Sequence, residues 1–512
     1  MPVDPRTPVI VGVGQFTERI DDPDYRGMSA VELATEAVRA ALADTGADVA
    51  TVAKAIEVFA GLRQFEICTP FASAPLGCSD NYIRSVAKRV GADPERAVLE
   101  PIGGNGPQKL VSEFGGAIAA GEIEVALILG SENGSTLKTF AGRDDKPDHS
   151  ETVGGQLDDR GYGFEQYMSE YTAKHGLTGA PVQYGLLDNA RRKRLGLSVD
   201  EYRLQMAELF APFSRVSAKN PFSSSPVERS VEELTTVTAE NRMICDPYPR
   251  LMVARDTVNQ GAAALIMSVD AARKLGVAEE KWVYLHGHAD QREQDLLDRE
   301  DVSVSYSSKQ AVAEALRGTG IGIDDVSTFD LYSCFPFPVF VVCDDFGLAA
   351  DDPRGLTLTG GLPYFGGPGN SYSLHGIAET VAAMRDKPGA FGLVGANGGV
   401  MSKYSVGVYS TTPTEWVADR STELQQYITD ALPKVAVTRN ANGAGVIETY
   451  SVRYDWPERT GVIIGRLDAD DSHFMAISTD NDLLTLMTDG DPLGAAITVT
   501  AGEDGVNRAV LA

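Results

Sequence analysis

A glycine-rich turn followed by a helix of small residues constrains the fold of this chain more than any other feature. The segment IGGNGPQKLVSEFGGAIAAGEIEVALILGSENGS begins at Ile102 and predicts a helix over Pro107–Ala120 and a buried strand over Val125–Leu129. A helix this rich in glycine and alanine has too little side chain to fill a gap, so it must pack closely against other backbone. We therefore expect this helix to lie at the centre of the fold.

The segments before this helix predict an α/β architecture. Pro8–Gly14 is a short apolar run that ends in glycine and predicts a first strand. Ser29 and Glu32 have the spacing of a capping box and predict the start of a helix, and Ala55–Gly61 predicts a second strand. A β-α-β order implies parallel strands joined by a right-handed crossover.

The first 412 residues are expected to form two similar halves, residues 1–270 and 271–412. Residues about 140–250 break the alternation of strands and helices with charged helices, which indicates an insertion over the core. The second half returns to the order of strand, helix and strand. Its first three elements are predicted at Trp282–Gly287, Ser308–Gly318 and Phe329–Tyr332.

The last hundred residues have a different character and are expected to form an added domain, residues 413–512. Short stretches that alternate polar and apolar residues are separated there by Asp, Gly and Asn turns, which predicts a small β-barrel or sandwich. The predicted strands are VIETYSVRY, TGVIIGRLD, HFMAIST, LLTLMT and AAITVTAG.

The net charge and the cysteine content indicate which binding partners and which cellular compartment suit this chain. The net charge is −27, and such an acidic chain repels nucleic acid and anionic lipid, although acidity also simply aids solubility. No apolar run reaches the ~18–20 residues of a membrane helix. The N-terminus has no basic stretch before its apolar one, so it predicts a strand and not a signal peptide. Five scattered cysteines without metal-site spacing favour a reducing, cytoplasmic setting and no bound metal.

Four segments in this order resemble the thiolase superfamily, and most closely its sterol-carrier-protein-type branch. They are Ile118 to Glu132 with its I-x-x-G and G-x-E motifs, Asn259–Val269, Leu331–Phe335 and Gly360–Gly369. Because of its added C-terminal domain, the whole chain resembles the subgroup called thiolase-like protein type 1. The resemblance implies two βαβαβαββ halves packed in αβαβα layers, followed by a small all-β domain that is barrel-like or OB-like.

The same resemblance implies that the thiolase nucleophile is missing. Counting back from Gly121, the position of the family's cysteine falls on Gly104. Gly367 stands at the histidine position of the G-G-x(4)-G-H-P-x-G motif, and Asn397 lies where other thiolases have a C-x-G cysteine motif. A thiolase needs a thiolate to carry the acyl group, so thiolase turnover is expected to be negligible.

Four other side chains are candidates for catalysis. Tyr332 stands where the family has an oxyanion-binding histidine, and Cys334 where the branch has its acid/base cysteine; each is alternatively a buried core residue. His375 is a candidate replacement for the missing imidazole, or a capping or surface histidine. Asn397, like Asn370, is a candidate donor to a thioester oxygen, and both also suit tight glycine turns.

Coenzyme A carries phosphates, so its binding site is expected to show local positive charge. Arg191, Arg192 and Arg194 belong to the one dense basic cluster in the chain, which is either a CoA site or a solvated helix face. Ser217 opens SAKNPFS, which resembles the family's loop beside the pantetheine arm. The candidate CoA ligands are therefore these arginines, Ser217 and Asn370.

Three functions follow as hypotheses. The first is a protein that binds acyl-CoA or CoA, belongs to the acyltransferase superfamily by descent, and holds no covalently bound cofactor. The second is a lyase that splits a hydroxyacyl-CoA by a retro-aldol reaction with Tyr332, since related retro-aldolases use tyrosines and a partner protein. The third is a non-catalytic scaffold whose C-terminal domain binds a protein. A working thiolase would need Cys334 as its nucleophile, and either a monomer or a homodimer is compatible with the sequence.

Overall fold

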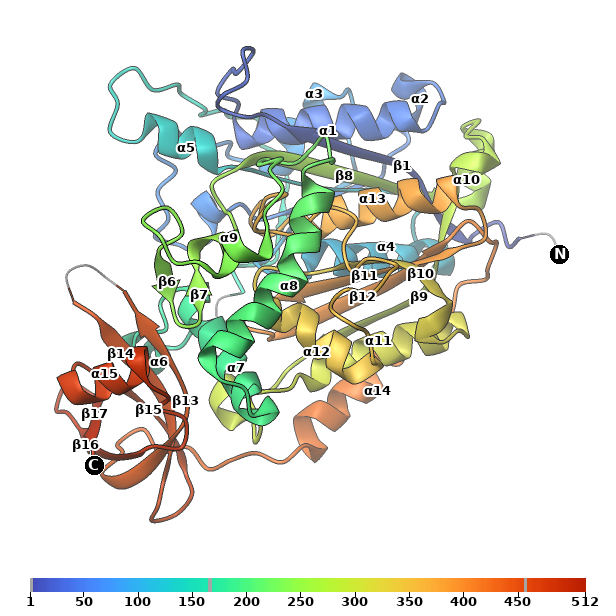
Figure 1. The fold of residues 1–512 in the computed structure, drawn as a ribbon. Coiled ribbons are helices and arrows are strands. Elements are labelled where there is room, and N and C mark those ends of the chain that lie inside the picture. Colours follow the sequence, from blue (N-terminus) through green and yellow to red (C-terminus); the bar gives the residue numbers. More distant parts are fainter. Residues whose placement is uncertain (1–2, 164–167, 455–457) are drawn as a thin grey trace.

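The structure is a computed model that describes residues 3–163, 168–454 and 458–512. Its body has five layers in the order helices, sheet, helices, sheet, helices (Figure 1). The strands form one ladder in the order β10-β11-β12-β9-β1-β8-β4-β2-β3-β5, in which β1 pairs antiparallel with both β8 and β9. This is the layered α/β architecture that the sequence predicts.

The N-terminal half follows the predicted order of strands and helices. Ser29 caps its first helix, and its capping box with Glu32 is present in full. The half contains β1 (Pro8–Thr17), α1 (Ala30–Asp44), α2 (Val49–Lys54), β2 (Val58–Leu62), α3 (Tyr82–Arg89), β3 (Arg96–Glu100), α4 (Gly106–Ala120), β4 (Val125–Asn133), β8 (Asn259–Ser268) and α10 (Val269–Lys274).

The C-terminal half repeats this order without counterparts of α2, β3 and α10. Residues 347–371, between α12 and α13, form turns and bends where the N-terminal half has β3. The half contains β9 (Val283–Arg292), α11 (Tyr306–Thr319), β10 (Val326–Leu331), α12 (Pro336–Phe346), α13 (Tyr372–Asp386), β11 (Phe391–Gly398) and β12 (Lys403–Ser410).

Helices α4 and α13 lie between the two sheet halves and contact strands of both. The small residues of α4 allow this close packing: a Cβ added at Gly115 would lie 2.8 Å from the ring of Trp416, which follows β12. Phe114 and Ile118 of α4 are buried in the same cluster as strand residues of both halves. The prediction that this helix is central is confirmed.

The insertion between β4 and β8 covers one edge of the sheet and one side of the body. Its short strand β5 (Asp158–Asp159) pairs with the edge strand β3. The other elements are α5 (Gly134–Phe140), α6 (Glu170–Lys174), α7 (Ala180–Leu195), α8 (Val199–Ser217), α9 (Val231–Thr235), β6 (Met243–Cys245) and β7 (Tyr248–Pro249).

The C-terminal segment forms a closed barrel of five strands after a linker over residues 411–442 that contains α14 (Ser421–Gln426). The stretch LLTLMT, predicted as a strand, is a helix, and that prediction is wrong. Asp480 caps this helix, and Leu483 and Met487, four residues apart, point into the barrel core. The barrel contains β13 (Gly443–Arg453), β14 (Thr460–Leu467), β15 (His473–Ser478), α15 (Asn481–Asp489), β16 (Ala496–Ala501) and β17 (Asn507–Leu511).

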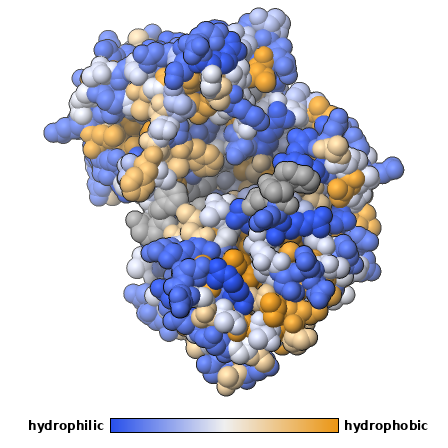
Figure 2. Space-filling model, turned by 90° about the vertical axis from the view of Figure 1, so that its left-hand side faces the viewer, coloured by the Kyte–Doolittle hydropathy of each residue, from blue (hydrophilic) through white to orange (hydrophobic). Residues whose placement is uncertain are grey.

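Helix α7 joins the barrel to the body. The buried Arg192 of α7 forms a two-pronged ion pair with Asp491 of the barrel, with both N···O distances 2.9 Å. Asn189 donates to the carbonyl of Tyr450, and Thr449 donates to that of Leu186. Seen from the left of Figure 1, the surface is hollowed between the upper body and the lower part that holds the barrel (Figure 2).

Candidate functional site

A cavity of about 430 Å³ lies where the loops of the two halves meet. The turn before α4, the segment after β10, the turn before α13, the end of β11 and the start of α7 all contribute to its wall. The residues that carry the argument below are Gly104, Tyr184, Tyr332, Cys334, Asn370 and Asn397. Four of the six were singled out as candidate side chains from sequence, and the structure brings them together.

Tyr332 fills the space that a side chain at position 104 would need. A Cβ added at Gly104 would contact the Tyr332 hydroxyl and lie 2.5 Å from two carbons of its ring, far inside normal contact distance. The backbone at Gly104 is not left-handed, so the conflict is with Tyr332 and not with the conformation. The two residues are therefore complementary: the glycine makes room for the tyrosine.

The turn that carries Gly104 is held by the helix at the other side of the cavity. Asn370 accepts a hydrogen bond from Gly103 N–H at 2.8 Å and donates to the carbonyl of Arg63 at 2.7 Å. Ser373 donates to the carbonyl of Gly104. In the described parts of the chain, the N–H groups of Gly104 and Asn105 have no partner, and they open the 15-residue helix α4. Such a helix N-terminus favours an electron-rich oxygen.

Tyr184, Asn397 and Cys334 form a second group in the cavity wall. The Tyr184 hydroxyl donates to the carbonyl of Gly399 at 2.6 Å and accepts from the Asn397 amide at 2.6 Å. The same amide lies 3.8 Å from the Cys334 sulfur. Asn397 Oδ1 is buried without a hydrogen-bond partner in the described structure. Asn397 thus offers a ligand an acceptor, whereas its N–H groups are already engaged.

Burial fixes the protonation of these groups. It raises the pKa of the Cys334 thiol to about 12 and the pKa of the Tyr332 and Tyr184 hydroxyls well above the usual value. Burial also raises the pKa of Cys68, the other cysteine in the wall, and the nearby Glu132 carboxylate adds to that rise. At neutral pH both sulfurs are thiols, and only a thiolate is an effective nucleophile.

Alkylation tests this protonation directly. We expect iodoacetamide at pH 7 to label the exposed Cys78 and to leave Cys334 and the buried Cys245 unlabelled, and peptide mass mapping reads out each site. Raising the pH increases the thiolate fraction, so labelling of accessible cysteines should accelerate. Labelling in urea, where all five react, is the control. Fast labelling of Cys334 in the folded protein would contradict its assignment as a buried thiol.

Several candidate residues lie outside the cavity. His375 is fully buried on α13, its Nδ1 lies 2.7 Å from Gln15 Oε1, and burial lowers its pKa to about 3. Arg191 and Arg194 both pair with Asp344, and Arg192 pairs with Asp491. Ser217 is buried, and its hydroxyl bonds to that of Ser223. The structure therefore does not place His375, the arginine cluster or Ser217 at the cavity, and Tyr184, which the sequence did not single out, takes a central place there.

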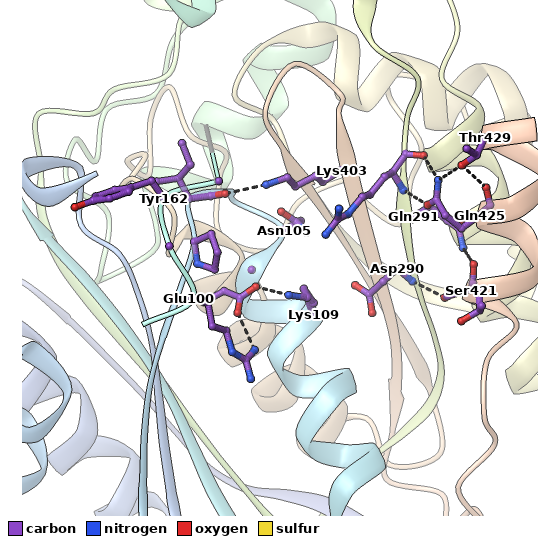
Figure 3. Close-up of a pocket in the computed structure, with 18 of the residues that line it drawn as sticks. Glu100, Asn105, Lys109, Tyr162, Asp290, Gln291, Lys403, Ser421, Gln425 and Thr429 are labelled. Atoms are coloured by element: carbon purple, nitrogen blue, oxygen red, sulfur yellow. Dashed lines mark hydrogen bonds and ion pairs between the residues drawn. The ribbon is translucent and has the colours of Figure 1, made fainter. Parts of the chain in front are cut away.

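A second pocket, of about 850 Å³, adjoins the cavity and shares Ile102, Gly163 and Lys403 with it (Figure 3).

In the part of the chain that the structure describes, no group of three His, Cys, Asp or Glu side chains is placed to hold a metal ion. Within the same residues, no helix has both the length and the apolar content needed to cross a membrane.

Comparisons with known proteins identify relatives of this chain in sequence and in fold. The family model of the thiolase-like protein type 1 additional C-terminal domain matches residues 423–504. No curated protein matches the chain in sequence. The solved structure of a monomeric SCP2-thiolase like protein type 1 from Mycobacterium smegmatis is 62% identical, and the match covers 100% of both chains with a TM-score of 0.87.

More distant solved structures share the fold. A structure described as "Ltp2-ChsH2(DUF35) aldolase" is 18% identical, with 79% of this chain and 98% of that chain covered and a TM-score of 0.57. Human mitochondrial 3-ketoacyl-CoA thiolase is 15% identical, with 80% of this chain and 100% of that one covered and a TM-score of 0.56. Together with the full-length match, they show that this chain belongs to the SCP2-thiolase-like proteins of type 1, which have a thiolase fold and an added C-terminal barrel.

Proposed function

We propose that the protein binds an acyl-CoA thioester in the cavity and does not form an acyl-enzyme. The observation that carries this proposal is the pairing of Gly104 with Tyr332, because the tyrosine takes the volume of the side chain that would receive the acyl group. A cavity of about 430 Å³ with few polar groups is within the size range of small-molecule sites. The thiolase fold of the chain supports the proposal that a thioester occupies this cavity.

The wall of the cavity supplies hydrogen-bond donors for a thioester oxygen. The N–H groups of Gly104 and Asn105 have no partner in the described structure, and the Tyr332 hydroxyl makes no hydrogen bond there either. Because burial raises the pKa of Tyr332, its hydroxyl keeps its proton and acts as a donor. Such donors stabilise negative charge on oxygen without a covalent step.

A matched set of titrations tests this proposal. Tyr332→Phe should weaken acetyl-CoA binding by about 2- to 10-fold, the value of one hydrogen bond, and leave the binding of free CoA unchanged. Tyr306→Phe, at an exposed tyrosine outside the cavity, is the control. Isothermal titration calorimetry measures each affinity. Wild-type protein that binds neither ligand, or a Tyr332→Phe variant that binds acetyl-CoA normally, would refute the proposal.

A second candidate function is a retro-aldol lyase, and the unpartnered Tyr332 hydroxyl favours it. That reaction needs a base for the hydroxyl proton and a donor for the enolate oxygen. Tyr332 suits the donor role, but its raised pKa makes it a poor base at neutral pH. Incubation with 3-hydroxyacyl-CoAs and assay for a carbonyl product separates the two functions: a product that depends on the Tyr332 hydroxyl would establish the lyase.

We also propose that the protein is a monomer, as the Mycobacterium smegmatis protein is described to be. The edge strand β3 is already covered by β5, and Arg160 N–H donates to the carbonyl of Leu99 at 3.1 Å. A covered edge cannot add another strand. Light scattering after gel filtration should give the mass of one chain, 54.6 kDa, and a mass of two chains would contradict this.

A further inference from the structure

The C-terminal barrel is closed by a short seam between β15 and β17. Among the described residues these two strands pair at one position, Ile477 with Arg508. The Asn507 side chain donates to the carbonyl of Met475 at 2.8 Å, and the Met475 N–H donates to the hydroxyl of Tyr171 at 3.2 Å. Tyr171 belongs to α6, which lies against the barrel (Figure 1). A side chain from outside the barrel therefore completes the hydrogen bonds of the seam.

His175, which follows α6, binds the backbone of β17 at this seam. The Asn507 N–H donates to His175 Nε2 at 2.9 Å, and His175 Nδ1 lies 2.7 Å from the carbonyl oxygen of Tyr171. Because a backbone N–H can only donate, Nε2 is the acceptor and carries no proton. Nδ1 therefore carries the ring proton and donates to the carbonyl. The ring is 0% exposed, so this neutral form uses both nitrogens and has no contact with water.

A second proton cannot bind to this ring while the seam is closed. It would add to Nε2 and face the Asn507 N–H, and two donors cannot bond to each other. Protonation of His175 therefore requires the loss of its hydrogen bond with Asn507. The environment of His473 in β15 is different, because its Nε2 lies 2.7 Å from the carboxylate of Glu448, which is a partner for a charged ring.

The charged groups around His175 offer an imidazolium no free carboxylate. Those on the elements that pack against it are Lys174 and Glu170 of α6, Arg439 of the linker, Arg453 of β13, Arg508 of β17 and Asp504 of the turn before β17. Both carboxylates among them, Asp504 and Glu170, already pair with a cation. The surroundings of the closed seam therefore favour the neutral ring.

We propose that His175 is a pH-sensitive clasp, which holds β17 to α6 when the ring is neutral and releases the two when the ring is protonated. The proton comes from solvent and binds to Nε2, and the hydrogen bond from Asn507 N–H breaks. Helix α6 leads into α7, whose first residue, Ala180, lines the cavity. The clasp thus joins the barrel to one wall of the cavity.

The pKa of His175 gives the direction of the pH dependence. Burial lowers this pKa below its ordinary value of 6.5 and Arg508 adds to the decrease, whereas the bond to the Tyr171 carbonyl and the Asp504 carboxylate act in the opposite direction. In the open seam the ring has its ordinary value, so below pH 6.5 the open form binds a proton that the closed form does not. The closed seam is therefore fully favoured above that pH and loses stability as the pH falls below it.

Hydrogen–deuterium exchange of the full chain, read by mass spectrometry of the peptide that contains β17, tests this proposal. After correction for the intrinsic exchange rate, the protection of β17 in the wild type should fall about tenfold from pH 7.5 to pH 5.5, as expected for one proton bound on opening. His175→Gln cannot titrate but keeps an acceptor for the Asn507 N–H, so its protection should change by less than about twofold. His149→Gln, at a histidine that contacts the carbonyl of Gly27, is the matched control and should show the wild-type fall.

The strand β8 of the body is the internal reference and should keep its protection at pH 5.5. Equal loss of protection in β8, no fall in the wild type, a full fall in His175→Gln, or no fall in His149→Gln would each overturn the proposal. Exchange of the histidine C2 hydrogen measures the protonation of His175 in the wild-type chain, so it does not depend on the folding of a variant. We expect a titration midpoint below pH 6.5 for His175, and a midpoint at or above that value would contradict the clasp.

Discussion

Gly104→Cys, which places a cysteine just before α4, is expected to destabilise the protein and not to create a thiolase. The new Cβ would lie 2.5 Å from ring carbons of Tyr332, which is buried and packs edge-on against Tyr372. Overpacking of this kind costs about 1–3 kcal/mol of the free energy of unfolding. We expect a decrease in the thermal unfolding midpoint, which measures this loss of stability.

A double-mutant cycle separates the clash from other effects of the substitution. In a Tyr332→Ala background the same cysteine has room. The loss in the free energy of unfolding caused by Gly104→Cys should therefore fall to about 0.5 kcal/mol or less. Gly116→Ala is a control on the same helix, because its Cβ would lie 3.7 Å from Trp416, an ordinary contact distance. An equal cost of Gly104→Cys in both backgrounds would show that Tyr332 does not occupy the space of that side chain.

Arg192→Ala is expected to loosen the barrel from the body. The Arg192 side chain is 1% exposed, and it binds Asp491, the carbonyl of Leu197 and the side chain of Asn189. Its removal leaves a cavity and breaks an ion pair. Asp491 is half exposed and can be rehydrated, so we expect a loss of about 3 kcal/mol, at the low end for buried pairs.

Limited proteolysis and thermal unfolding measure this effect. The variant should be cleaved faster in the linker between body and barrel than the wild type. Lys193→Ala, at the exposed neighbour on α7, is the control and should behave as wild type. A variant as resistant and as stable as the wild type would mean that Arg192 does not anchor the barrel.

Sequence alone predicted the features that depend on local chemistry. The capping box at Ser29 and Glu32 and the small-residue helix α4 are present as predicted, because capping and close packing follow from neighbouring residues. The strand after α4 was also predicted, although β4 continues to Asn133. The stretch LLTLMT is short and apolar, which predicts a strand, but Asp480 caps it as a helix in the structure.

The rest of the site depends on residues that are far apart in the chain. The arginines of α7 suggested a ligand site, but their partners, Asp344 and Asp491, come from α12 and the barrel, which no local pattern reveals. Tyr184 lies in the insertion, and only the folded structure places it in the wall of the cavity. His375 has the residue type that catalysis favours, but its place on α13 puts it in the core.

Mass spectrometry after incubation with acetyl-CoA tests the central claim most directly. Under native conditions the account predicts a complex of one chain with one ligand, and under denaturing conditions the unmodified chain alone, because the thiols of Cys334 and Cys68 stay protonated and Gly104 has no side chain. An acetyl group that remains on the denatured chain and maps to a residue of the cavity would contradict the account.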